Sequence, residues 1–289
     1  MNAIKEALEE WLRDILTSGI MSNLSGLFDQ VNTKVGEIAT TVGKTPQGWN
    51  AAIYNMVRTL SDNVMVPIAA MVLAFVMSLE LLQMVIDRNN LNDGDTFAFF
   101  KWVFKSSAAC LIVTNTWNIV MAVFDVGQHI VEQAAGVAIG NVAIDSALFM
   151  TGLDEKLAAM SLGALLGLWV QTGVVKLCMG LLQICILVVV FGRMIEIYLV
   201  TSVAPVPMAT MMNKESEQIG RNYLRNLIAL AFQAFLIIVC VAIYAALVDH
   251  ITVSDDISYA LWTCMGYTVL LCFSLFKTGS LAKSIFNTH

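Results

Sequence analysis

Four charged side chains lie within stretches that are otherwise apolar. These four residues are the ones whose chemistry could serve a function. They are Glu80, Lys176, Arg193 and Glu196. A charge inside a membrane span is costly and usually faces protein or water, so each residue is a functional candidate. The chemistry that such groups would supply is the coupling of an ion or a solute to transport.

Each of these charges also has a structural interpretation. Glu80 lies near one end of its apolar stretch, where the carboxylate can reach the interface or pair with a basic neighbour. Arg193 and Glu196 are three residues apart on one helical face, so a local ion pair is available to them. Their alternative partners are another subunit and an anionic lipid. Lys176 falls in the middle of a long apolar region, and its position decides where the bilayer boundary lies.

Patterns typical of enzymes and metal sites are missing from the sequence. It contains no GxSxG, phosphate-binding loop or HExxH motif. His129, His250 and His289 are scattered without ligand spacing, and the six cysteines lie in apolar runs rather than in polar loops. We therefore expect no enzymatic activity, no cofactor and no metal, with bound phospholipid as the remaining option.

The elements that must hold these residues are membrane helices. Of the 289 residues, 58% are hydrophobic and 13% are charged, whereas about a quarter of the residues in a soluble domain are charged. So few charges cannot cover a soluble protein of this size, and lipid must replace water over much of the surface. The net charge of −6 also argues against the basic surface that direct nucleic-acid binding needs.

Apolar stretches of about 17 to 25 residues mark the membrane spans. Five of them predict an all-α, polytopic membrane protein, whose transmembrane domain covers 64–289. The spans are 64–86, 106–124, 177–203 with a helical extension from 157, 226–248 and 257–276. The region 157–201 has no turn signal, so it is either one long helix or a helix that bends near Lys176.

The distribution of basic residues predicts the orientation. They lie after the first span, after the third span and in the C-terminal tail: Arg88, Lys101, Lys105, Lys214, Arg221, Arg225, Lys277 and Lys283. The segments 125–155 and 249–256 contain no Lys or Arg. Because cytoplasmic loops carry the excess of basic residues, we predict an external N-terminus and a cytoplasmic C-terminus.

Residues 1–63 are predicted to form an extracytoplasmic region of amphipathic helices. One apolar stripe contains Ile4, Leu8, Trp11, Leu12, Ile15 and Leu16, and a second contains Leu24, Leu27, Phe28, Val31, Val35 and Ile38. A third short segment covers 49–60, after a Gly- and Pro-containing linker. These helices either lie on the outer leaflet and pack on each other, or form a collar that contacts neighbouring subunits.

Small and amide side chains inside the spans indicate contacts between helices. Gly163 and Gly167 form a small-xxx-small pair, which allows helices to approach closely. We expect this surface to contact another copy of the chain. Gln233 is an uncharged polar group within the fourth span, where side-chain amides often make hydrogen bonds between helices.

The segment after the third span has the most distinctive sequence. Pro205 and Pro207 remove backbone donors and end the helix, so the chain must turn there. Gly220, Tyr223 and Arg225 follow at the start of the fourth span. The aromatic and basic side chains of this segment are expected to anchor the span at the inner surface.

The long apolar helix with a terminal Arg, the Ala-Pro-x-Pro-x-Ala segment and the Gly-x-x-Tyr-Leu-Arg segment occupy about residues 190 to 240. Together they resemble the TrbL family, polytopic inner-membrane subunits of conjugative type IV secretion systems. The similarity is strongest to members carried by integrative conjugative elements of Gram-positive bacteria. The resemblance implies a non-enzymatic homo-oligomer that forms a ring in the plasma membrane, with lipids, other membrane subunits and the secretion ATPases as partners.

Two other functions remain as alternatives to DNA and protein transfer through a secretion channel. A solute or ion transporter would use Glu80, Lys176 or Arg193 as coupling groups. The absence of an inverted repeat and the odd number of spans argue against it. A pore protein related to phages or toxins is the second alternative.

Overall fold

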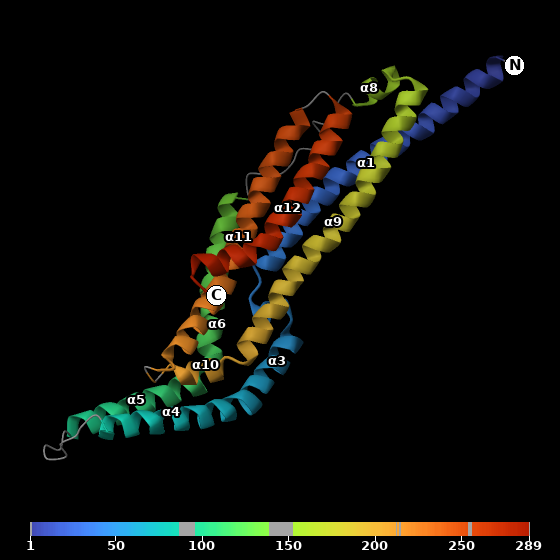
Figure 1. Cartoon of the computed structure of the whole chain (residues 1–289). Helices are drawn as coiled ribbons and strands as arrows, with labels where there is room; N and C mark the ends of the chain where they lie inside the picture. The colour runs from blue at the N-terminus through green and yellow to red at the C-terminus, as the bar shows by residue number, and fades with distance from the viewer. Residues whose placement is uncertain are drawn as a thin grey trace. The chain divides into compact units, whose positions relative to one another are not determined.

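The computed structural model describes residues 2–86, 96–138, 153–211, 213, 215–253 and 256–288. Every regular element within these residues is a helix, which confirms the all-α class (Figure 1). The α-helices are α1 (Asn2–Val42), α2 (Pro46–Trp49), α3 (Ala51–Leu60), α4 (Val66–Ile86), α5 (Thr96–Thr114), α6 (Thr116–Ala138), α8 (Leu153–Ala159), α9 (Leu162–Ser202), α10 (Pro205–Thr210), α11 (Glu217–Asp249) and α12 (Ile257–Ile285).

The chain forms two compact units. The first unit consists of Met1–Val42, Val131–Val190 and Leu236–Thr278. The second unit consists of Gly43–Ile130, Phe191–Phe235 and Gly279–His289. Helices α9, α11 and α12 contribute residues to both units.

Helix α1 packs lengthwise beside α9 in the first unit (Figure 1). The buried residues of α1 recur every three or four positions, at Leu16, Ile20, Leu24, Leu27, Val31, Val35, Ile38 and Val42. Those of α9 follow a similar spacing, with one interval of seven residues after Met179, at Leu165, Leu168, Thr172, Val175, Met179, Ile186 and Val190. Such stripes are typical of helices that bury one face against each other along their length. The two apolar stripes of the N-terminal sequence therefore belong to one continuous helix.

Three apolar clusters are seen among the described residues of the second unit, and two of them position the helices around the turn that follows α9. One joins α6, α9 and α11 through Val120, Phe124, Met194, Ile197, Ala204, Leu227, Leu230 and Ala231. The other joins α4, α5 and α10 through Ala69, Leu73, Met77, Ala109, Val113 and Ala209. The short helix α10 therefore lies against the α4–α5 hairpin, and this contact holds the turn that follows α9.

The predicted span 106–124 contains a sharp bend. Helices α5 and α6 meet at Asn115, and Phe99–Thr114 makes an angle of 65° with Thr116–Val137. The side chains of Thr114, Asn115 and Thr116 each donate to a carbonyl of the preceding turn, at 2.9 Å in each case. Side chains that bond to the backbone in this way compete with the helical ladder and bend helices.

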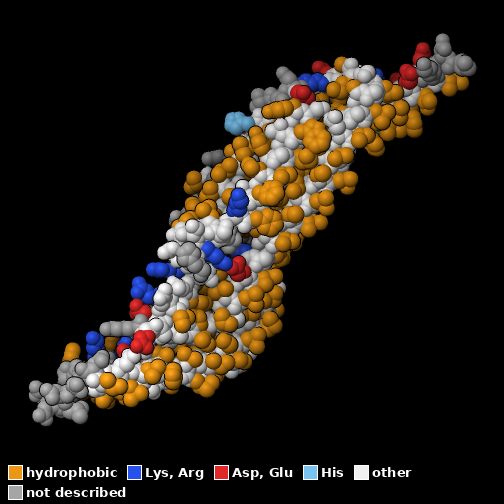
Figure 2. All heavy atoms as spheres, viewed as in Figure 1, with side chains coloured by type: hydrophobic (Ala, Val, Ile, Leu, Met, Phe, Trp, Pro, Cys, Tyr) orange, Lys and Arg blue, Asp and Glu red, His pale blue; other side chains and the backbone are white. Residues whose placement is uncertain are grey.

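Four helical runs among the described residues are long and apolar enough to cross a membrane: Ala51–Ile86, Leu162–Ser202, Glu217–Asp249 and Ile257–Ile285. The bent pair α5–α6 would be a fifth. Of the two possibilities for 157–201, the structure shows one helix from Leu162, preceded by the separate α8. Figure 2 shows hydrophobic side chains over the exposed face of α9, as expected for a surface in contact with lipid.

Part of the evidence for the predicted orientation lies outside the described residues. This holds for Arg88, Lys214 and Asp255, and for residues 139–152 of the segment 125–155. The external N-terminus, the cytoplasmic C-terminus and the extracytoplasmic placement of residues 1–63 stay predictions.

Candidate functional site

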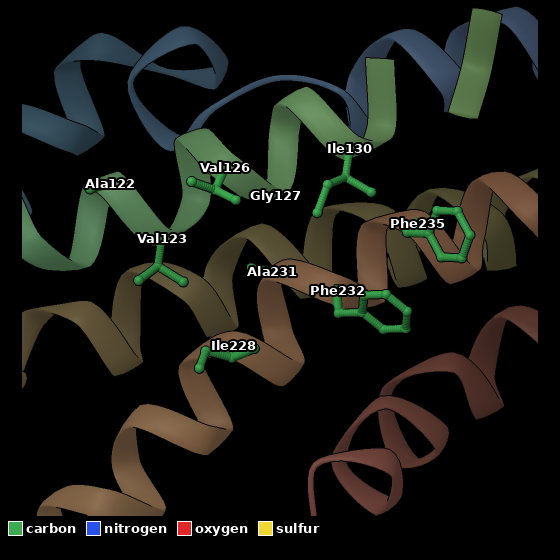
Figure 3. Close-up of a pocket in the computed structure, with 9 residues that line it drawn as sticks. All are labelled: Ala122, Val123, Val126, Gly127, Ile130, Ile228, Ala231, Phe232 and Phe235. Carbon is green, nitrogen blue, oxygen red and sulfur yellow. The ribbon is translucent and has the colours of Figure 1, made fainter. Parts of the chain in front are cut away.

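An apolar groove of about 410 Å³ lies between α6 and α11 in the second unit (Figure 3). Its lining consists of Ala122, Val123, Val126, Gly127, Ile130, Ile228, Ala231, Phe232 and Phe235. The volume is in the range of small-molecule sites. Since all nine residues are apolar or glycine, the groove suits a hydrocarbon group.

The groove exists because two small residues bring its helices together. A Cβ atom on Gly127 would lie 3.1 Å from the Cβ of Ala231 and 3.3 Å from its carbonyl oxygen. The backbones approach closely at this point, whereas the larger side chains on both helices project beside the contact, Phe232 and Phe235 among them (Figure 3). The close contact between Gly127 and Ala231 thus forms one wall of the apolar groove.

Arg193 of α9 is a buried charged residue in the second unit. Its side chain is 6% exposed, and its Nη2 donates to the carbonyl of Leu230 on α11 at 3.4 Å. Its Nε has no hydrogen-bond partner among the described residues. Burying a guanidinium with an unsatisfied donor is costly. The packing of α9 against α11 around this side chain must therefore offset that cost.

The predicted local ion pair between Arg193 and Glu196 is not formed in the described structure. Glu196 instead accepts from Nζ of Lys283 on α12, at 2.8 Å. Arg193 is directed toward α11 and Glu196 toward α12, so the two side chains bind different neighbours. Arg193 and Glu196 therefore link α9 to α11 and α12, and they do not pair with each other within α9.

Gln233 lies at the contact of α11 with the end of α12. It is buried, and a Cβ atom on Gly279 would come within 3.3 Å of its Nε2. One position earlier on α11, Phe232 meets Phe286 edge to face, with ring centroids 5.6 Å apart. The amide is thus packed between helices, and the hydrogen bond between helices that was expected of it stays a prediction.

Glu80 of α4 binds the ammonium group of Lys105 on α5. Gln83, one turn later, donates to Glu215 at 2.8 Å. The carboxylate therefore pairs with a basic neighbour, which was the structural interpretation of this residue.

The proline and glycine residues after α9 form a compact turn. Pro205 occupies the first turn of α10, where the missing backbone donor costs nothing. Gly220 is buried, and a Cβ atom there would lie 2.0 Å from Cγ of Met211 and 2.5 Å from the carbonyl oxygen of Pro207. Only glycine fits between these atoms.

Two side chains that were expected to anchor the start of α11 differ in their surroundings. Tyr223 donates from its hydroxyl to the carbonyl of Val200 at 3.1 Å and so ties α11 to α9. Arg225 is exposed. It lies three residues before Ile228 on the helical face that leads into the groove.

The candidate residues of the first unit lie on α9. Gly163 and Gly167 are exposed, and a Cβ atom on either would meet nothing within 4 Å. Lys176 is exposed and donates to Oδ1 of Asn23 on α1 at 3.2 Å. No described residue packs against the glycine pair, and a contact with another copy stays a prediction.

Several contacts of these sites were not found from the sequence. Lys283 was read only as part of a basic tail, and Gly127 was not singled out. The buried hydrogen bond from Trp117 Nε1 to Tyr54 Oη, at 2.9 Å, is a further contact that the sequence does not predict. Its partners are 63 positions apart, and no spacing rule within one helix connects them. Across the described residues, no three His, Cys, Asp or Glu side chains are grouped to hold a metal.

Comparison with known proteins identifies the family. The model of the TrbL/VirB6 plasmid conjugal transfer-like proteins matches residues 31–205, from the last third of α1 to the first residue of α10. No curated protein and no solved structure matches the chain significantly. The matched region covers well over half of the chain and only overlaps the segment 190–240 that carries the sequence resemblance. The chain belongs to the TrbL/VirB6 plasmid conjugal transfer-like family.

Proposed function

We propose that this chain is a non-enzymatic, ring-forming subunit of a conjugative type IV secretion channel in the inner membrane, where it supports transfer of DNA and protein. The family match over residues 31–205 carries the proposal, because it suggests a component of a conjugal transfer system. The apolar helices suggest a multi-pass membrane protein, which is what a channel subunit requires.

The exposed face around Gly163 and Gly167 supports self-association. Both glycines are open, and the apolar side chains of Leu166 and Val170 beside them are 45% and 51% exposed. Small residues let membrane helices approach closely, and neighbouring apolar side chains then add packing contacts. A second copy of the chain is the partner that we assign to this face, repeated around a ring.

The other proposed partners are membrane subunits of the secretion system, the secretion ATPases on the cytoplasmic side and phospholipid. The α6–α11 groove and Arg225 together fit a phospholipid. The groove would take an acyl chain, and the guanidinium, one turn before Ile228, would bind the phosphate of the head group.

The transporter alternative receives less support from the geometry. Glu80 binds Lys105, and Lys176 binds Asn23, so each of these two candidates has a structural role that accounts for its charge. Arg193 is buried against the Leu230 carbonyl.

Oligomer assembly tests the proposed function. Gly167→Leu places a large side chain on the open face of α9, so we expect the ring to dissociate and conjugation to fall by about tenfold or more, since tight helix packing depends on small residues. Native mass spectrometry in lipid nanodiscs measures the assembly, and plasmid transfer frequency measures function. Gly167→Ala is the matched control and should keep both. A wild-type protein that is monomeric in nanodiscs, or undiminished transfer after deletion of the gene, contradicts the proposal.

The lipid site has a separate test. Val126 is 63% exposed at the rim of the groove, so Val126→Trp should fill the groove without disturbing the Gly127–Ala231 contact. We expect the bound phospholipid seen by native mass spectrometry to be lost in this variant and kept in Val126→Ala. Equal lipid binding in the two variants would show that the groove is not the site.

A further inference from the structure

The outward face of α1 is polar from Thr17 to Val42. Among the side chains described in this range, the exposed positions are Ser18, Ser22, Asp29, Thr33, Gly36, Glu37 and Thr40. They lie on the side opposite the buried stripe, with one interval of seven residues between Ser22 and Asp29. Polar positions thus share this face of the helix over about six turns.

From about the level of Gln30 onward, this polar face lies beside the part of α9 that is predicted to span the membrane, 177–203. Asn23 donates to Oγ1 of Thr172 at 3.2 Å and accepts from Lys176. One heptad later, Gln183 donates to Gln30 at 3.1 Å. The contacts advance in the same direction along both helices, so α1 and α9 are parallel, and each level of α1 has a known level of α9 beside it.

At the same levels, α9 exposes a different kind of surface. Val174, Leu177, Leu181, Ile184 and Leu187 are 43–73% exposed. Helix α12 is fixed at this depth by Cys272, whose thiol donates to the Leu182 carbonyl at 3.6 Å. Both helices are long and apolar enough to cross the bilayer. The first unit therefore presents an apolar surface and a polar surface at the same depth.

The charged residues of α1 determine whether its polar face can lie against lipid or requires water. Hydroxyl groups tolerate lipid because they can bond to their own helix, as Thr40 does with the Gly36 carbonyl at 2.8 Å. Carboxylates cannot do so. Glu37 pairs with Lys34, but Asp29 forms no ion pair with any described residue. A carboxylate exposed to acyl chains is strongly disfavoured, so this face requires water.

We propose that the polar face of α1 lines a water-filled passage at the depth of the bilayer. The passage rests on the proposed ring, since neighbouring copies must close it. The proposal places the second half of α1 inside the membrane thickness, which differs from the extracytoplasmic position expected for residues 1–63. Its occupant is water, and a hydrated polar substrate would move along Asp29, Thr33 and Glu37.

Cysteine accessibility tests the passage on the full chain in nanodiscs. All six native cysteines are replaced by Ala, and cysteine is then introduced by Thr33→Cys on α1 or by Leu187→Cys on α9. These positions lie one turn beyond the Gln30–Gln183 pair on their respective helices. A membrane-impermeant maleimide reacts with the hydrated thiolate, so we expect Thr33→Cys to label at least about tenfold faster. Ser22→Cys and Val174→Cys form a second pair near Asn23. If the Cys-free chain does not insert, the buried Cys264 and Cys272 are retained.

The outcomes separate this inference from the proposed function. Slow labelling of Thr33→Cys in rings verified by native mass spectrometry overturns the passage and leaves the ring intact. Equally fast labelling of Leu187→Cys overturns the assigned depth. If the protein is monomeric in nanodiscs, both the proposed ring and the passage are contradicted. Fast labelling at Thr33 and Ser22 with slow labelling at Leu187 and Val174 is the result that supports the inference.

Discussion

The two units hold their helices together by different means. In the first unit, α1 and α9 share long apolar stripes linked by amide and hydroxyl groups, such as Asn23 with Thr172 and Gln30 with Gln183. In the second unit, backbones nearly touch at Gly127 and Gly220, and ion pairs link separate helices. Side-chain seams can adjust to a change in one residue, whereas close backbone contacts cannot, since protein interiors are densely packed.

This difference predicts opposite tolerance at glycines. Gly220→Ala in the second unit places a Cβ atom 2.5 Å from the Pro207 carbonyl oxygen, and we expect a loss of roughly 1–3 kcal/mol because the backbone must shift. Thermal unfolding in detergent measures the loss. Gly180→Ala on α9 in the first unit meets nothing within 4 Å; it should be neutral or slightly stabilising. Equal stability of the two variants would break the comparison.

Removal of a buried hydrogen bond in the second unit should have a smaller effect. Trp117→Phe deletes the donor to Tyr54 while most of the ring contact, at 5.3 Å between centroids, is kept. We expect a loss of about 1–2 kcal/mol, since the hydroxyl of Tyr54 loses its donor in a buried position. Trp262→Phe, at a side chain that is 46% exposed in the first unit, is the control. A loss as large in the control would show that the ring size, rather than the hydrogen bond, matters.

The weakest effect is expected for the amide seam of the first unit. Gln183→Leu removes the donor to Gln30, and hydrogen bonds between membrane helices contribute about 0.6 kcal/mol on average. A double-mutant cycle with Gln30→Leu gives the coupling energy directly. A coupling above about 2 kcal/mol, beyond the largest values typical of such bonds, would mean that the first unit also depends on specific polar contacts.

The sequence predicted the helical class, because that class depends on local composition. The end of α9 before Pro205 follows from the missing backbone donors. The partners of the charges were less predictable. Glu80 binds Lys105, 25 residues away, and Glu196 binds Lys283, 87 residues away. Such pairs depend on how helices are arranged, which one sequence does not specify.

Two local features were readable in principle. The run Thr114-Asn115-Thr116 offers three side chains that bond back to the preceding turn, and it bends the span that was expected there. The polar positions of α1 between Ser18 and Thr40 share a helical face. In the sequence, the apolar stripe on the opposite face is a stronger signal than these polar positions.

The amide pairs of α1 and α9 also bear on how the protein is made. Lys176 with Asn23 and Gln183 with Gln30 repeat at one heptad, so a slip of α1 by seven residues would break both pairs, form one new polar pair and leave the other amide without its partner. Helix α1 leaves the ribosome long before α9, and it is not among the helices apolar enough to enter the bilayer unaided. We therefore expect α1 to remain at the membrane surface until α9 has inserted. The first unit would then assemble only after most of the chain has been synthesised.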